Sequence, residues 1–360
     1  MTQNTKNFIL SSDIDEVIRE LPASVVERFY GRRVLITGGM GFLGRYFTEF
    51  FTRLNAQRPN QFMPCELVVL DNFITAGEHG RTASKSREFA FIEHDIIQPF
   101  YPERPLDYII HAAGIASPFW YRKYPVETLK VSTVGTENIL QLARKHAGSK
   151  TIVFSSSEIY GDPDAKHVPT AESYRGNISC LGARACYDEG KRVGETYCRV
   201  FHETYGVDVK MIRPFNVYGP GMQKTDYRVL PNFGAKIMEG KPLHIYGDGS
   251  QTRTFCYVTD AIRGFLQVLV DGVAGEPYNV GNPSPEISMV ELAKQISNVL
   301  GKEAKYELVE YPDTYPGDEP MRRCPDITKA KTQVGFNPTV TLQDGLKRFF
   351  GWAAETYPMT

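Results

Sequence analysis

The sequence predicts an α/β fold with a doubly wound parallel sheet and a smaller, mixed α/β lobe toward the C-terminal end. Short apolar runs alternate with segments of helical periodicity up to about residue 215. A glycine-rich turn joins the first apolar run to the first long helical segment, and beyond Pro214 Pro-rich turns and shorter elements follow. Because parallel strands need long crossovers, the alternating part should form a Rossmann-type sheet with helices on both faces.

The order of the elements follows from the same patterns. Apolar residues spaced by three and four predict short helices in an N-terminal extension, residues 1–30. Strands are predicted at 33–37, 67–70, 91–94, 108–110, 151–154 and 207–212, and the clearest helices at 131–145, 184–202, 288–300 and 342–356. For a chain of 360 residues, roughly 150 per domain gives about two units. We place the first at 31–215, with a later return of the chain near 250–275, and the second mainly at 216–360.

Composition argues against several function classes. Forty-one Lys and Arg against 42 Asp and Glu leave a net charge of −1, so no positive field would gather nucleic acid. No stretch approaches the roughly 18 apolar residues of a membrane span. The six cysteines form no Cys-x-x-Cys pair and have no histidine at metal-ligand spacing, which predicts reduced thiols and no metal site. The first ten residues lack the features of a secretory signal, so we expect a cytoplasmic protein.

The glycine turn is the first candidate site. Gly38, Gly41 and Gly44 follow a strand and open a helix, with Phe42 and Leu43 between the last two. Missing side chains would let the backbone approach a pyrophosphate, and the amides at the start of the helix would face its charge. The spacing differs from Gly-x-Gly-x-x-Gly, and a tight strand-to-helix turn alone could also explain it.

Residues that end the next two strands favour a dinucleotide. Asp71 ends the second strand, where a carboxylate would accept hydrogen bonds from an adenosine ribose and repel a 2′-phosphate, so NAD is favoured over NADP. Asn72 follows it, and the two residues could instead only begin a turn. Asp95 and Ile96 follow the third strand, a position that suits an adenine contact.

A tyrosine and a lysine four residues apart form the candidate chemical centre. In the helix predicted at 184–202, this offset puts the phenol of Tyr187 and the ammonium of Lys191 on one face. A nearby cation stabilises tyrosinate, so we expect a lowered phenol pKa and a base that removes a hydroxyl proton as hydride leaves the same carbon. Taken alone, the two could be an exposed helical pair, but after the glycine turn the catalytic interpretation is favoured.

Three hydroxyls and a carboxylate follow the fifth strand, in the run Ser155-Ser156-Ser157-Glu158. Ligands bind at the carboxyl ends of strands in open parallel sheets, so these side chains should face the reacting group. The alternative is a polar loop that caps the next helix, but capping needs one hydroxyl rather than three followed by an acid.

Together these motifs resemble the extended short-chain dehydrogenase/reductase family, which includes NAD-dependent epimerases and dehydratases. The resemblance spans roughly residues 31–350 and rests on the glycine turn, His111-Ala112-Ala113-Gly114, the serine-rich run and the Tyr187/Lys191 pair. It implies that the first unit binds NAD, also through Ala112 and Ala113, and that the second binds a nucleotide sugar. Within the family, the strings at 184–196, 249–255 and 323–327 look most like the UDP-glucuronate decarboxylases.

The resemblance also implies a reaction and its residues. NAD would oxidise the C4 hydroxyl of the sugar, carbon dioxide would leave the resulting β-keto acid, and hydride would return to C4. Tyr187 would be the base, Lys191 its partner and a ligand of the nicotinamide ribose, and Ser156 a hydroxyl bonded to the C4 oxygen. Ser157 and Glu158 would face C5 and C6. Arg323 would meet the substrate carboxylate and the enolate, since a guanidinium fork suits both, although outside this context it could be a surface arginine.

Further positions carry over from the same resemblance. Those assigned to the substrate are Asn216, Arg228 and Arg253 for the diphosphate and uridine, and Ser117, Pro118 and Tyr121 for the sugar pocket. A homodimer is expected, packed through the helices around 128–146 and 184–205. Departures from the family pattern are Ser132 in place of an asparagine, Gly221 in place of an arginine common among the decarboxylases, and a bulky, basic loop at 118–123.

Two alternatives stay open. One is a related 4-epimerase, dehydratase or C4 oxidoreductase acting on another nucleotide sugar. Glu158 separates the chain from the 4-epimerases, which carry small residues there, and Ser157 replaces the aspartate of the 4,6-dehydratases. The other is a non-catalytic NAD(H)-binding protein, which the intact Tyr187 and Lys191 oppose.

Overall fold

The computed structural model describes residues 8–76, 88–311 and 320–357, so residues 1–7 of the expected N-terminal extension lie outside the described ranges. The described part of that extension is helical, as the apolar spacing predicts. It consists of α1 (Ser11–Glu20), α2 (Ala23–Val26) and the 3-10 helix η1 (Glu27–Phe29). α1 packs on α3 (Phe42–Ala56) and α9 (Val258–Asp271).

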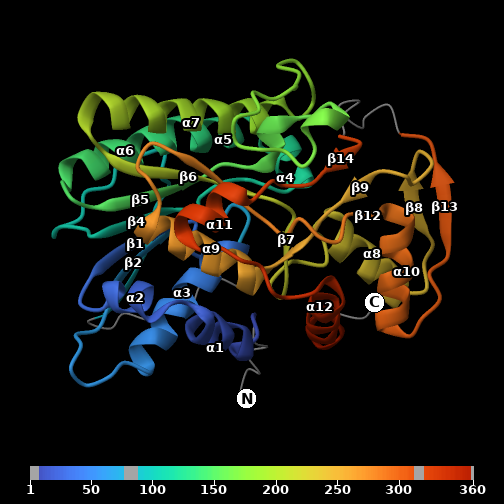
Figure 1. Ribbon diagram of the computed structural model, residues 1–360, viewed down its shortest axis with the longest axis horizontal. Coiled ribbons are helices and arrows are strands. Elements are labelled where there is room, and N and C mark those ends of the chain that lie inside the picture. Colours follow the sequence, from blue (N-terminus) through green and yellow to red (C-terminus); the bar gives the residue numbers. More distant parts are fainter. Residues whose placement is uncertain (1–7, 77–87, 312–319, 358–360) are drawn as a thin grey trace.

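A seven-stranded sheet forms the centre of the larger unit (Figure 1). In spatial order its strands are β11 (Pro277–Val280), β6 (Asp208–Pro214), β5 (Lys150–Phe154), β4 (Tyr108–His111), β1 (Arg33–Thr37), β2 (Glu66–Asp71) and β3 (Phe89–Glu93). Every neighbouring pair is parallel. The predicted doubly wound sheet is confirmed, and its strand order reverses between β1 and β4, where such sheets bind ligands.

Successive side chains of the central strands enter two different cores. Val34 and Ile36 of β1 pack in the core that includes α3 and α9, whereas Leu35 between them packs with α6 (Thr136–Lys145) and α7 (Ala185–Tyr205). All three side chains are fully buried. Figure 1 shows α5 (Pro125–Lys130), α6 and α7 over one face of the sheet and α3 and α9 over the other. Burial on both faces explains why the strands read as continuous apolar runs.

Two details differ from the sequence prediction. The short strand β11 joins β6 after α9, so the chain returns to the sheet as far as Val280, beyond the predicted 250–275. α11 (Thr328–Val334) then packs against α9 and β11. The helix predicted at 131–145 begins with a π-helical turn, η3 (Val131–Gly135), and α4 (Pro118–Lys123) and α5 precede it. β11 begins with Pro277, which weakens the strand signal of so short a run, and a single wide turn carries too little periodicity to be predicted.

The smaller lobe consists of short elements beside the carboxyl ends of the strands. Its helices are α8 (Val229–Met238), α10 (Met289–Leu300) and α12 (Leu342–Thr356), and its strands are β7 (Val217–Tyr218), β8 (Leu243–Tyr246), β9 (Thr252–Arg253), β10 (Cys256–Tyr257), β12 (Ile287–Ser288), β13 (Tyr306–Val309) and β14 (Arg322–Arg323). The 3-10 helices η4 (Ser157–Tyr160) and η5 (Ala165–His167) lie between β5 and α7. Parallel pairing of β14 with β9 sets Arg323 beside Arg253. No helix in the described ranges has the length and apolar character that a bilayer crossing needs.

Candidate active site

Two cavities open at the carboxyl ends of the parallel strands, and they share part of their walls. The first, of about 320 Å³, is lined by the glycine turn and by residues that follow β2, β3, β4 and β5. The second, of about 870 Å³, lies between these strand ends and the smaller lobe. Tyr187, Glu158, Asn216 and Arg228 line both cavities. Ala116, Val217 and Met222 also line both, so a group bound in the first cavity would meet a molecule in the second along this shared wall.

The glycine turn is shaped by close backbone packing. Gly38 has a φ of +66°, and a Cβ there would lie 2.6 Å from the Cα of Ala113. A Cβ at Gly44 would overlap the carbonyl of Gly38. Gly41 is the N-cap of α3, and a Cβ there would approach only the Gly38 carbonyl oxygen, at 3.3 Å. Packing thus requires Gly38 and Gly44, and it leaves the amide end of α3 open toward the cavity, as a phosphate group needs.

Asp71 lies where the sequence places it and has an additional role. Its Oδ2 accepts a hydrogen bond from the Met40 amide at 2.8 Å, and its Oδ1 accepts one from the Phe73 amide at 2.8 Å. The carboxylate therefore ties the end of β2 to the glycine turn. Burial raises the pKa of Asp71, and the backbone amides oppose that shift. The turn interpretation and the ribose interpretation are compatible, because the residue also lines the first cavity.

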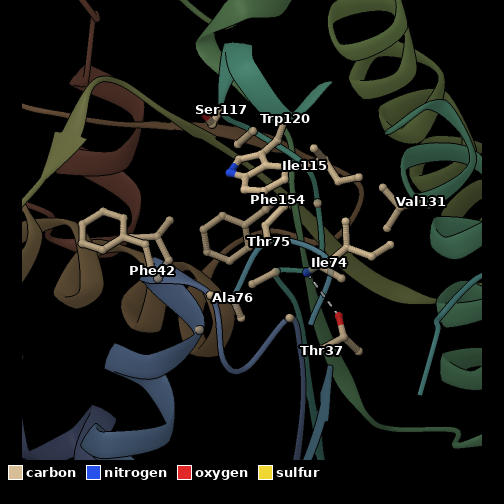
Figure 2. Close-up of a pocket in the computed structure, with 18 of the residues that line it drawn as sticks. Thr37, Phe42, Ile74, Thr75, Ala76, Ile115, Ser117, Trp120, Val131 and Phe154 are labelled. Carbon is tan, nitrogen blue, oxygen red and sulfur yellow. Dashed lines mark hydrogen bonds between the residues drawn. The ribbon is translucent and has the colours of Figure 1, made fainter. Parts of the chain in front are cut away.

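The structure brings together all the residues predicted to bind the dinucleotide. Besides the glycines, Asp71 and the Tyr187/Lys191 pair, the predicted wall residues are Phe42, Leu43, Asn72, Asp95, Ile96, Ala112 and Ala113, and each lines the first cavity. Figure 2 shows side chains from other elements around the same cavity, among them Thr75 and Trp120, which sequence reasoning missed. The dashed line at Thr37 marks the hydrogen bond that its Oγ accepts from the Ala113 amide at 3.3 Å.

Tyr187 and Lys191 are both buried, and burial decides their protonation. The Lys191 ammonium lies 5.8 Å from the centroid of the Tyr187 ring and donates a hydrogen bond to the Phe154 carbonyl at 2.6 Å. Burial raises the pKa of Tyr187 to about 12, against a hydrogen bond with Ser156 that lowers it. Burial also lowers the pKa of Lys191 to about 8. The expected lowering of the Tyr187 pKa is therefore wrong for this structure, because desolvation of the phenolate outweighs the neighbouring groups.

The serine-rich run combines the two interpretations left open by the sequence. The Ser156 hydroxyl accepts a hydrogen bond from the Glu158 amide at 3.2 Å and so caps η4. The same hydroxyl is hydrogen-bonded with Tyr187, so it also belongs to the chemical centre. Ser157 is buried and lines the first cavity with Ser155.

Glu158 and Arg323 form a fork-to-fork ion pair on the wall of the second cavity. Arg323 Nη1 lies 2.5 Å from Glu158 Oε1, and Nη2 lies 2.7 Å from Oε2. A second arginine, Arg184, contacts the same Oε2. These residues are separated by up to 165 positions in the sequence. Arg184 was not among the predicted site residues, although it precedes Tyr187 by three positions, a spacing that puts both on one face of a helix start.

The other predicted substrate residues fall mostly on the second cavity. Pro118, Tyr121, Asn216, Arg228 and Arg253 line it, and the Tyr121 ring stacks on Tyr187 with centroids 5.5 Å apart. Ser117 differs, because it lies on the wall of the first cavity.

The charge of the second cavity suits a polyanion. Seven cationic side chains line it, namely Arg122, Lys123, Arg184, Arg228, Lys236, Arg253 and Arg323. Among the described residues, Glu158 is the acid on this wall and is paired with two of them, and Asp226 beside the wall pairs with Arg228. A diphosphate with a further carboxylate matches this excess of positive charge.

Comparison with known proteins agrees with this architecture. Residues 34–281 match the NAD dependent epimerase/dehydratase family. The chain belongs to this family, which confirms the resemblance seen in the sequence. DesIV, a dTDP-glucose 4,6-dehydratase from Streptomyces venezuelae solved with NAD bound, superposes with a TM-score of 0.75 and 26% identity, over 90% of this chain and 97% of that one. A UDP-glucuronic acid 4-epimerase from Bacillus cereus, solved with UDP-glucuronic acid and NAD, gives a TM-score of 0.74 and 25% identity, over 90% and 100% of the chains.

Similarity of sequence points to a narrower class of enzyme than similarity of structure does. UDP-glucuronic acid decarboxylase 6 of Arabidopsis thaliana is 39% identical over 315 residues, which cover 87% of this chain and 86% of that protein. UDP-glucuronic acid decarboxylase 1 of Xenopus tropicalis is 39% identical over 318 residues, which cover 88% and 71%.

Proposed function

We propose that the chain decarboxylates UDP-glucuronate to UDP-xylose in an NAD-dependent reaction. The observation that carries this proposal is the Arg323–Glu158 pair: Glu158 lines both cavities together with Tyr187, and Arg323 lines the second. A guanidinium fork at this place suits a sugar carboxylate and the enolate that remains after carbon dioxide leaves. The decarboxylases among the relatives support the same reaction.

The first cavity fits NAD. Gly38 and Gly44 clear space that a Cβ would fill, the amides at the start of α3 would face the pyrophosphate, and Asp71 would accept from the adenosine ribose. When bound, NAD would supply the hydride acceptor for the sugar C4 and the hydride donor for its later reduction. Lys191 and Tyr187 line the same cavity, where they would hold the nicotinamide ribose.

Tyr187 would take the proton of the C4 hydroxyl. Its phenol is protonated at neutral pH in this structure, since burial raises its pKa to about 12. The Lys191 ammonium, 5.8 Å from the ring centroid, would favour the phenolate. Ser156, hydrogen-bonded with the phenol, would hold the C4 oxygen in line. The same pair would return a proton to that oxygen when C4 is reduced.

Arg323 would change partners during the reaction. In this structure its fork is occupied by Glu158, so a substrate carboxylate must displace that carboxylate to reach it. At the 4-keto stage, the C5–C6 bond breaks, carbon dioxide departs, and the electron pair becomes an enolate with its charge on the C4 oxygen. Arg323 and Arg184, which both line the second cavity, would stabilise this charge, and a proton would then return to C5.

The test is direct. The purified chain is incubated with UDP-glucuronate and NAD, and carbon dioxide and the nucleotide product are followed together. We expect one carbon dioxide for each UDP-xylose, with no net consumption of NAD. UDP-glucose, which lacks the carboxylate, is the matched control and should give no pentose. Formation of the C4 epimer without carbon dioxide would replace this function by 4-epimerisation.

We also propose a homodimer in the cytoplasm. Val126 and Leu129 of α5 and Val193 and Val200 of α7 are between 40% and 57% exposed, and the two helices pack side by side. Figure 1 shows both helices on one outer face of the sheet, where a second copy would bury these side chains. Light scattering of the wild type and of Val193→Glu tests this: we expect a dimer that the glutamate splits, and a monomeric wild type would contradict it.

Six free thiols support the proposed cytoplasmic location, which fractionation of cells would test.

A further inference from the structure

The first cavity, which is proposed to bind NAD, is called the dinucleotide cavity from here on. The N-terminal extension reaches it. Phe8 lies on the cavity wall together with Gly41, Phe42 and Gly221. It stands three residues before α1 and is partly buried. Neither the proposed reaction nor the family assignment uses this part of the chain, because the family match begins at residue 34.

The ring of Phe8 is held between two segments that line the same cavity. Gly221 has a φ of +97°, and a Cβ at this glycine would lie 2.7 Å from Cε1 of Phe8. On another side, the guanidinium carbon of Arg45 lies 3.9 Å from the ring centroid, and Arg45 Nε donates to the Met40 carbonyl of the glycine turn at 2.8 Å. The departure at Gly221 noted in the sequence therefore has a structural counterpart, since the ring of Phe8 occupies the space that a side chain there would need.

The helix behind Phe8 is firmly anchored. Asp13 is buried and accepts a hydrogen bond from the Tyr257 hydroxyl at 2.8 Å. Glu16 accepts one from the Thr259 hydroxyl at 2.8 Å. The Tyr46 hydroxyl of α3 contacts both Asp13, at 3.4 Å, and the carbonyl of Pro220, at 3.1 Å. Because Pro220 directly precedes Gly221, these contacts connect α1 to the loop that faces Phe8.

We propose that Phe8 is a cofactor-positioning residue: its ring closes the dinucleotide cavity beside the glycine turn and slows the departure of bound NAD. An apolar ring at this place excludes water from the phosphate end of the cavity, and its anchor keeps the ring there without a large ordering cost. The proposal rests on the proposed use of NAD and adds that Phe8 sets how long NAD stays bound.

The experiment compares full-length variants in NAD binding without any nucleotide sugar. We expect Phe8→Ala to release NAD about tenfold faster than the wild type, with the affinity lowered by a similar factor. In turnover assays the change should appear in the KM for NAD more than in kcat, since Phe8 lines the first cavity and not the second. Phe62→Ala, which removes a ring stacked on Tyr30 away from both cavities, is the matched control.

A second variant tests the contact that holds the Phe8 ring rather than the ring itself. Arg45→Met removes the cation beside the ring together with its hydrogen bond to the Met40 carbonyl, and leaves Phe8 in place, so release should quicken by about threefold. Equal release rates for wild type, Phe8→Ala and Arg45→Met, with unchanged thermal unfolding, would overturn the inference. A chain that binds no NAD at all would instead contradict the proposed function, so the two failures are distinguishable.

Discussion

The two cavities that meet at Tyr187 are built from different materials. The dinucleotide cavity is made largely of backbone and apolar groups, with glycines packed on Ala113 and with Asp71 held by two amides. The substrate cavity is made of long cationic and aromatic side chains from segments far apart in the sequence. A backbone site binds the part that family members share, whereas side chains can be exchanged to select a sugar. The difference explains why the same fold serves epimerases, dehydratases and decarboxylases.

The largest effect is expected at the shared wall. Tyr187→Phe removes the hydroxyl that would exchange the C4 proton, so turnover should fall by roughly 10³-fold or more. NAD binding should remain, because the ring still lines the first cavity. Single-turnover measurement of NADH formation checks this. Wild-type turnover in the variant would remove Tyr187 from its proposed role.

A smaller and more selective loss is expected in the substrate cavity. Arg323→Ala should lower carbon dioxide release by about 10²-fold while leaving NAD affinity unchanged, since Arg323 lies on the second cavity only. Arg323→Lys keeps the charge but loses the fork, so it should recover part of the rate. Simultaneous titration of NAD and assay of carbon dioxide distinguish the two cavities. An equal loss in both would mean that the cavities are not separable.

In the dinucleotide cavity, a change in backbone space should act through the fold. Gly38→Ala places a methyl group 2.6 Å from the Ala113 backbone at a φ of +66°, so we expect destabilisation by about 2–4 kcal/mol together with weaker NAD binding. Gly148→Ala, at a φ of +88° with open space around it, separates conformational strain from collision. Chemical unfolding of both variants measures the difference. Equal destabilisation would show that strain, rather than packing on Ala113, accounts for the glycine.

The buried Asp13 carboxyl of α1 should make the stability of the fold depend on pH. Burial raises the pKa of Asp13 from 3.8 to about 6, against hydrogen bonds from Tyr257 and Tyr46 and the charge of Arg348. The folded chain therefore binds more protons at Asp13 than the unfolded chain between these values, so this contribution to stability is complete below pH 3.8 and is lost as pH rises through about 6. Its full size is on the order of 3 kcal/mol.

Asp13→Asn removes this titration. Relative to the variant, the wild type should lose stability between pH 4 and pH 7, as measured by urea unfolding at each pH. A constant difference across that range would mean that Asp13 keeps an ordinary pKa.

Sequence patterns predicted those parts of the site that depend on neighbours along the chain. The glycine turn, Asp71 at the end of β2 and the Tyr187/Lys191 pair each occupy one strand end or one helix face, and the structure places all of them on the first cavity. Local spacing is sufficient for such features, because strand and helix periods determine where each side chain points.

Other parts could not be predicted in this way. The pairing of Glu158 with Arg184 and Arg323, the placement of Phe8 against Gly221 and the addition of β11 to the sheet join segments that are distant in the chain. The pKa of Tyr187 is raised, whereas its spacing from Lys191 predicts a lowered value. Spacing reveals a nearby lysine but not the extent of desolvation.

The sequence by itself determined the parallel α/β architecture, the family and the dinucleotide site, because alternating apolar periods and a glycine turn act over a few residues. Only the tertiary structure decided which charges share the substrate cavity, how deeply the tyrosine is buried and what the N-terminal segment covers. Charge pairing and desolvation depend on distance and burial in space, and these arise only when remote segments pack together.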